Sequence, residues 1–356
     1  MMDRISSFGA SVQMGYQINS MQSQLNRLVG ETSSGRKANP EASLGTAAAL
    51  LYQLQSQSDQ QSGLQTELTV ASQRLDTAQT ALTSLSSSVE TMVNAANGIS
   101  AGDDVALSAV GSQATSAINQ VMSLLNTSFD GTGVFGGDSV AQPVKPADAS
   151  GGLSSIVQNV LSAAVSAKGA PLTQSDVSNL ISGPNGLASV FADTNTDPTQ
   201  RYAGGVYTGS TDGQPTKVII GANQTVQYDS SANQPAFRDL LKGLSMLSML
   251  SAPSSQLDDT AKNALLTQAG SVLTSAQKEL TDLQGNLGSV QATVSSASDA
   301  QQSAAAATQA QILNYVQADT YSDSTQISTL QTQLQASYSL TSQISQLSLV
   351  HYMPTN

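Results

Sequence analysis

Hydrophobic residues in the first hundred positions recur at the spacing of a coiled coil. From residue 50 to residue 96 the intervals alternate between four and three residues. The members of this seam are Leu50, Leu54, Gln57, Gln61, Leu64, Leu68, Ala71, Leu75, Ala78, Leu82, Leu85, Val89, Met92 and Ala96. A mean period of 3.5 residues predicts a helix over about 44–97, roughly 80 Å long. Because the seam includes Ala and Gln, we expect this helix to depend on neighbouring helices for stability.

Further helices are predicted on both sides of the middle of the chain. The first segment is interrupted by the Gly- and Pro-containing stretch 30–40, and a third helix is expected after Asp103 and Asp104. A helical pattern returns at 237–250 and continues from 257 to about 315. Its near-heptad residues are Ala276, Leu280, Leu283, Leu287, Val290, Val294 and Ala297. A last helix is expected near the C-terminus.

The middle of the chain, residues 129–236, has a different pattern. Short runs of strand composition at 206–208, 217–220 and 225–228 are separated by Gly, Pro, Asp and Asn, and one helical stretch covers 153–167. We predict a mainly α fold: an elongated rod of long N- and C-terminal coiled-coil helices packed together, with a small β-containing domain inserted mid-chain. The predicted domains are terminal helices at 1–40 and 320–356, a helical rod at 41–128 and 237–319, and the insert at 129–236.

Composition excludes several functions. The 356 residues contain no Cys, one His and 13 basic residues, and the net charge is −12. These numbers argue against a disulfide framework, a thiolate metal site and a nucleic-acid surface. No apolar run reaches the length of a membrane span, and the first residues lack the apolar core of a cleaved signal peptide. No titratable cluster is found, so we expect neither an enzyme, nor a cofactor, nor a metal site.

Several strings resemble the bacterial flagellin superfamily. Residues 32–39 are similar to the Leu-Ser-Ser-Gly-x-x-x-Asn element between its first two helices, and 94–98 to the Ala-Asn-Gly that closes its long helix. Residues 347–353 resemble the Leu-Ser-Leu-Leu-x-Tyr-Leu ending of the branch at the hook–filament junction, the third hook-associated proteins. The Arg-Asn-x-Asn-Asp-Gly-x-Ser element of filament flagellins is missing near 66–76. This absence also favours the junction branch.

The resemblance implies a structural subunit of the bacterial flagellum that serves motility. Such a protein is exported without a cleaved signal peptide and lies outside the cell. It assembles with copies of itself and contacts a hook-side junction protein and flagellin. An export chaperone is implied by the resemblance alone. No nucleic acid and no membrane are expected as partners.

The terminal apolar stripes are the candidate assembly interface. Apolar stripes on polar, weakly stabilised helices favour coupled folding and binding, although an ordinary intramolecular core is the plainer interpretation. The candidate residues are Ile5, Phe8, Val12, Ile18, Met21, Leu25, Leu28, Ile327, Leu330, Leu334, Ile344, Leu347 and Val350. Two alternatives stay open: a filament flagellin, and a coiled-coil adhesin or phage-fibre protein that would form stable trimers.

Overall fold

The computed structural model divides the chain into two compact units, which are described separately. Residues 2–99, 103–137, 142–209 and 215–350 are described, with the backbone alone at 2–8, 10, 11 and 345–350. Unit 1 comprises residues 1–63 and 302–356, and unit 2 comprises residues 64–301. Two long helices, α3 (Ala48–Asn97) and α9 (Asp259–Val316), contribute to both units. The prediction of a mainly α fold with long terminal helices packed together and a small mid-chain insert is confirmed.

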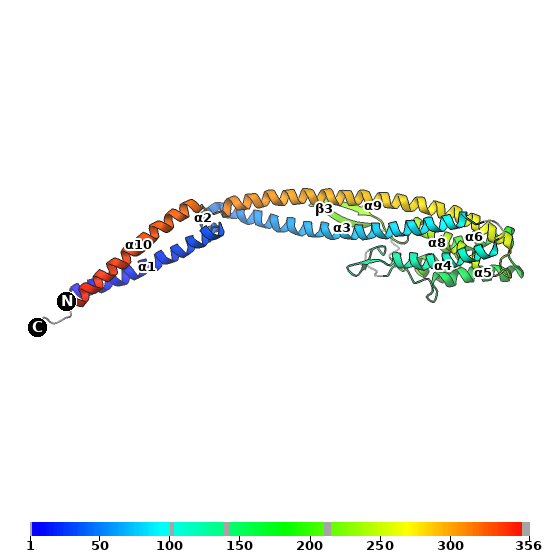
Figure 1. Ribbon diagram of the computed structural model, residues 1–356, viewed down its shortest axis with the longest axis horizontal. Coiled ribbons are helices and arrows are strands. Elements are labelled where there is room, and N and C mark those ends of the chain that lie inside the picture. Colours follow the sequence, from blue (N-terminus) through cyan, green and yellow to red (C-terminus); the bar gives the residue numbers. More distant parts are fainter. Residues whose placement is uncertain (1, 100–102, 138–141, 210–214, 351–356) are drawn as a thin grey trace. The chain divides into compact units, whose positions relative to one another are not determined.

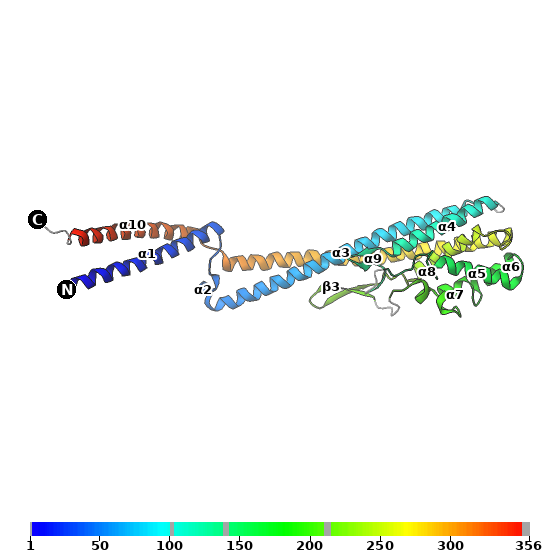
Figure 2. The same ribbon diagram turned by 90° about the horizontal axis from the view of Figure 1, so that it is seen from below.

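Unit 1 contains the two terminal helices. They are α1 (Met2–Ser34) and α10 (Thr320–Val350), and they lie side by side and antiparallel in Figures 1 and 2. Between α1 and α3 the chain forms the short α2 (Pro40–Leu44) and the 3-10 turn η1 (Gly45–Ala47). A small core joins the start of α3 to the end of α9 and consists of Leu51, Leu54, Ile312 and Val316.

Unit 2 is built around helices that share one continuous hydrophobic core. The seam of α3 and the seam of α9 both contribute, and so do α4 (Asp104–Leu125), α8 (Pro235–Ser248) and the 3-10 turn η4 (Met249–Ser251). In the part of α3 that belongs to unit 1, the seam position predicted at Leu50 is wrong, because Leu50 is 43% exposed and Leu51 is 1% exposed. Leu51 lies three residues before the buried Leu54, on the same helix face.

An aspartate side chain caps the N-terminus of α4 and another caps the N-terminus of α9. The Asp103 carboxylate accepts a hydrogen bond from the backbone N–H of Ala106, which confirms that this acidic pair opens α4. Asp258 has the same role at α9, where it accepts from the Ala261 N–H at 2.8 Å. At the other end of α3 the helix stops at Asn97, as the Asn-Gly pair predicts.

The insert between α4 and α8 contains two hairpins and several short helices. Strands β1 (Ser128–Phe129) and β2 (Thr132–Gly133) form one antiparallel pair; β3 (Thr216–Gly221) and β4 (Gln224–Tyr228) form the other. The helices are α5 (Leu153–Lys168), α6 (Gln174–Ser182) and α7 (Leu187–Phe191), followed by the turns η2 (Pro198–Gln200) and η3 (Tyr202–Val206). The strands predicted at 217–220 and 225–228 and the helix predicted at 153–167 are confirmed.

The strand predicted at 206–208 is wrong. Gly204 adopts a φ of 82°, and the chain turns so tightly that the Tyr207 N–H donates to the Tyr202 carbonyl. This turn buries both tyrosines and stacks their rings 6.2 Å apart. Tyr207 keeps an extended character in isolated bridges to Val144 and Ala203. The insert is also more helical than its turn-rich composition predicts, since α6 and α7 were not expected.

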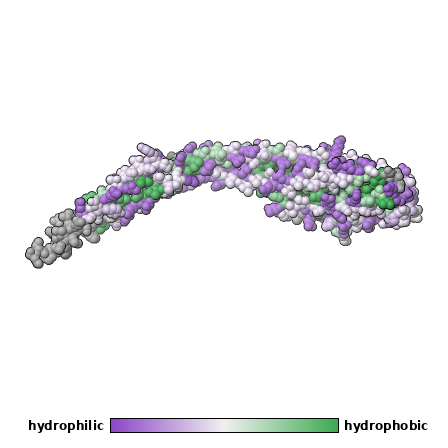
Figure 3. Space-filling model, in the orientation of Figure 1, coloured by the Kyte–Doolittle hydropathy of each residue, from purple (hydrophilic) through white to green (hydrophobic). Residues whose placement is uncertain are grey.

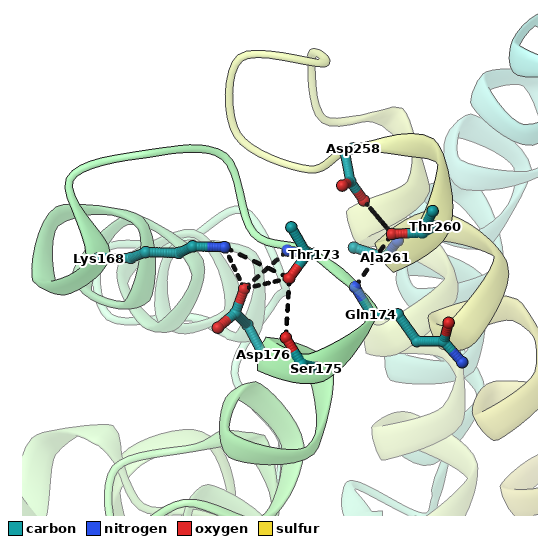
Figure 4. A network of polar contacts seen from close by, with 8 residues as sticks. All are labelled: Lys168, Thr173, Gln174, Ser175, Asp176, Asp258, Thr260 and Ala261. Carbon is teal, nitrogen blue, oxygen red and sulfur yellow. Dashed lines mark hydrogen bonds and ion pairs between the residues drawn. The ribbon is translucent and has the colours of Figure 1, made fainter.

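A polar network at the surface links α5, α6 and α9 (Figure 4). The Asp176 carboxylate pairs with Lys168 and accepts from both the backbone N–H and the hydroxyl of Thr173, each at 2.8 Å. This is a capping box at the start of α6. The Gln174 N–H donates to the Thr260 hydroxyl, which in turn donates to Asp258 at the start of α9.

Candidate assembly surface

Polar contacts fix the register of the two terminal helices. The Gln22 side-chain amide donates to the Tyr338 hydroxyl at 2.6 Å, and the Thr341 hydroxyl lies 3.1 Å from the Met14 sulfur. These pairs join Met14 and Gln22 of α1 to the second half of α10. The antiparallel pairing therefore aligns the two candidate stripes along one helix pair.

The stripes are only partly buried by this pairing. Leu28 and Leu334 are the well-covered members, with exposed fractions of 3% and 6%. Half-buried members are Ile18, Met21, Leu25, Ile327, Leu330 and Ile344. Val12 is 42% exposed. The side chains of Ile5, Phe8, Leu347 and Val350 lie outside the described part of the structure.

A compact turn after α1 holds the other end of the helix pair. Gly35 takes a φ of 67° and its carbonyl accepts from the Ala318 N–H, while the Lys37 N–H donates to the Val316 carbonyl. Glu31 is buried at 5% exposure, pairs with Arg27 at 3.0 Å and accepts from the Ala38 N–H at 3.0 Å. One carboxylate thus ties the end of α1 to the chain that leaves it.

The sequence-based set of interface candidates does not include two buried acidic residues of this region, Glu31 and Asp323. Glu31 has a sequence signal, because it stands four residues after Arg27 on one helix face. Asp323 is 8% exposed, and its Oδ2 has no hydrogen-bond partner among the described residues. No feature of the sequence distinguishes Asp323 from an ordinary acid in the first turn of a helix.

Neither a metal site nor a membrane span is found in the part of the chain that the structure describes. Among the described residues, no three His, Asp or Glu side chains lie close enough to hold a metal ion. Within the same residues, every helix is too short or too polar to cross a membrane. On the face drawn in Figure 3, hydrophobic residues occur in small groups between hydrophilic ones. His351 lies outside the described residues.

The antiparallel terminal helices, with their apolar stripes half covered, define a mainly helical protein whose two chain ends pack together. Comparison with protein families identifies the family to which this helical protein belongs. Residues 5–139 match the bacterial flagellin N-terminal helical region, and residues 262–353 match the bacterial flagellin C-terminal helical region. Together the two regions make up more than half of the chain, which therefore belongs to the bacterial flagellin superfamily. A search of curated proteins found no individual match.

Family membership settles the general function. The protein is a structural subunit of the bacterial flagellum and not an enzyme, and it acts outside the cell in motility. Members of this family self-assemble into helical polymers, so a second copy of the chain is an expected neighbour.

Proposed function

We propose that the chain is a subunit of the hook–filament junction. The observation that carries this proposal is the C-terminal string Leu347–Met353, which resembles the end of junction proteins more closely than that of filament flagellins. The missing Arg-Asn-x-Asn-Asp-Gly-x-Ser element near residues 66–76 supports the same position. In this role the chain contacts a hook-side junction protein at one end and flagellin at the other, and an export chaperone accompanies it before secretion.

The proposed mechanism is mechanical and uses the terminal stripes. Ile18, Met21 and Leu25 on α1 are half-buried in the single chain, and so are Ile327 and Leu330 on α10. Covering the remaining apolar area would stabilise an assembly by about 25 cal/mol per Å² removed from water. The proposed assembly interface also includes four further residues of the same stripes: Ile5, Phe8, Leu347 and Val350.

Assembly on hooks distinguishes the junction protein from a filament flagellin. Purified chain is mixed with hook fragments, or kept alone at rising concentration, and followed by light scattering and electron microscopy. A junction protein stays unpolymerised alone and caps the hook ends. Long filaments without hooks would instead assign the chain to the filament, which the family match allows equally. Stable trimers that survive removal of residues 1–40 and 320–356 would contradict both roles.

A single exposed residue tests the stripe without disturbing the fold. Val12 lies on the stripe and is 42% exposed, so Val12→Asp should leave the helical content unchanged and strongly reduce hook capping. Val29→Asp is the matched control, because Val29 is 49% exposed on the same helix but lies outside the stripe. Equal capping by the two variants would refute the stripe as an interface.

A further inference from the structure

The described methionine side chains of the two units differ in how far solvent reaches them. In unit 1, Met14 and Met21 are half-buried on α1, and their spacing of seven residues places both on one helix face. In unit 2, the methionines are 3% exposed or less: Met92, Met122, Met246 and Met249. The chain contains no Cys, so methionine thioethers are its only sulfur atoms. Among the described methionines, an oxidant in solution therefore has direct access to those of α1 alone.

The two accessible thioethers differ in their contacts with α10. The Thr341 Oγ1 lies 3.1 Å from the Met14 sulfur and 2.8 Å from the Ser337 carbonyl oxygen, so its one proton can go to either acceptor. Within the described residues, no hydrogen bond reaches the sulfur of Met21. A thioether is a weak acceptor, whereas the oxygen of a sulfoxide carries a partial negative charge and is a strong one. Oxidation of Met14 would thus create a strong acceptor beside a hydroxyl that is already in place.

We propose that Met14 and Met21 are sites of oxidation by hydrogen peroxide, and that the Thr341 hydroxyl holds the sulfoxide formed at Met14. In this reaction a lone pair of the sulfur attacks one oxygen of the peroxide, and the O–O bond breaks. The proton of the attacked oxygen passes to the other oxygen, which leaves as water. The thioether is oxidised by two electrons and the peroxide is reduced by two. The flexible methionine side chain lets the new oxygen turn toward Thr341.

The two sites differ in what oxidation does to the apolar stripe of α1. A sulfoxide replaces an apolar group by a polar one, which disrupts interfaces that contain methionine. At Met14, the hydrogen bond from Thr341 offsets this cost and keeps α1 paired with α10. At Met21 the polar oxygen stays on the stripe, so the oxidised chain presents a weaker surface to other chains. This last consequence rests on the proposed use of the stripes in assembly, whereas the oxidation itself does not.

Peptide mass spectrometry tests the two sites in the free, full-length chain. The chain is treated with hydrogen peroxide, and the reaction is stopped at intervals with excess free methionine. We expect sulfoxide to form about tenfold faster at Met14 and Met21 than at Met92 and Met122, because a buried sulfur reacts only when its surroundings open. Equal rates at all four positions would overturn the proposal.

Hydrogen exchange of the α1 amides, before and after peroxide, tests the role of Thr341. Thr341→Val is compared with Thr332→Val, because both threonines are exposed on α10 and donate to the carbonyl four residues earlier. We expect oxidation to speed exchange about fivefold more in Thr341→Val than in Thr332→Val, the effect of one lost hydrogen bond. Adding Met14→Leu, which removes the oxidisable sulfur, should abolish this difference. A difference that persists with Met14→Leu, or that never appears, would overturn the role of Thr341.

Capping of hook fragments tests the consequence for assembly separately. If the untreated chain does not cap hooks, the proposed function fails, while the oxidation rates still decide the two sites. We expect peroxide to reduce capping strongly in the natural chain and to leave it unchanged in the double variant Met14→Leu, Met21→Leu, because Leu keeps the apolar volume. An equal loss of capping in the double variant would place the sensitive group elsewhere and overturn the consequence for assembly.

Discussion

The two units of the protein bury their apolar residues to very different extents. In unit 2 a single cluster extends from Leu68 to Val294 and includes the fully buried Phe135 and Phe237, whose rings meet edge to face at 5.6 Å. In unit 1 the described cluster has four members, and the α1–α10 pair adds mainly Leu28 and Leu334. Apolar burial is the largest stabilising contribution to folding. Unit 2 is therefore expected to have a larger free energy of unfolding than unit 1.

The difference shows how the same secondary structure can have two origins. The helices of unit 2 are stabilised by tertiary packing of their apolar faces, as most helices in globular proteins are. The terminal helices are equally regular, but their stripes stay half exposed in the single chain. In the proposed assembly, another chain would cover these stripes.

The largest effect is expected from removing an aromatic side chain in unit 2. Phe237→Ala leaves a cavity among fully buried residues and should lower the free energy of unfolding by about 3–5 kcal/mol. Leu334→Ala in unit 1 should cost only about 1 kcal/mol, because its surroundings are half exposed and can relax. Urea unfolding followed by circular dichroism measures both values. Similar losses for the two variants would break the contrast between the units.

Replacing one helical glycine in each unit by alanine should change stability by an intermediate amount and in opposite directions. In unit 2, a Cβ at Gly111 would lie 2.4 Å from the backbone nitrogen of Ser251, so Gly111→Ala should destabilise by about 1–3 kcal/mol. In unit 1, a Cβ at Gly30 meets no atom within 4 Å, and Gly30→Ala should stabilise α1 by about 0.5–1 kcal/mol. Hydrogen exchange of the α1 amides and the urea midpoint report the two changes. Effects of the same sign would mean that close packing is not what separates the units.

The sequence predicted the long helices well because their signal is periodic and repeated. The positions Leu68, Leu75, Leu82, Leu85 and Val89 of the predicted seam are all buried. Their spacing alone is sufficient, since a helix face is defined by residues three and four apart. The first turns of the seam were less certain, and there Leu51 takes the place expected for Leu50.

The insert and the assembly surface were harder to predict for physical reasons. Val206, Tyr207 and Thr208 have strand propensity, but the left-handed Gly204 and the burial of two tyrosines produce a turn. At the surface, the pairing of α1 with α10 depends on contacts between distant segments, such as that of Gln22 with Tyr338. Periodicity predicts which face of a helix is apolar, but it does not tell which partner covers that face.

The smallest effect is expected from acid, and it should be confined to the unit with the polar network. The hydrogen bonds from Lys168 and from Thr173 lower the pKa of Asp176 from its usual 3.8 to about 2. Because the folded-state pKa is the lower one, the ionised Asp176 stabilises unit 2 above about pH 4. This contribution is lost as the pH falls through about 2.

The difference between the natural chain and Asp176→Asn isolates this contribution, because other carboxyl groups titrate equally in both. We expect the natural chain to have the higher urea midpoint at pH 6, and the gap to close between pH 4 and pH 2. Lys168→Met, which removes the largest cause of the lowered pKa, should narrow the same gap at pH 6. Hydrogen exchange of the α1 amides should not distinguish Asp176→Asn from the natural chain. A gap that stays constant with pH would show that Asp176 acts through shape alone, and that the capping box at α6 does not depend on its charge.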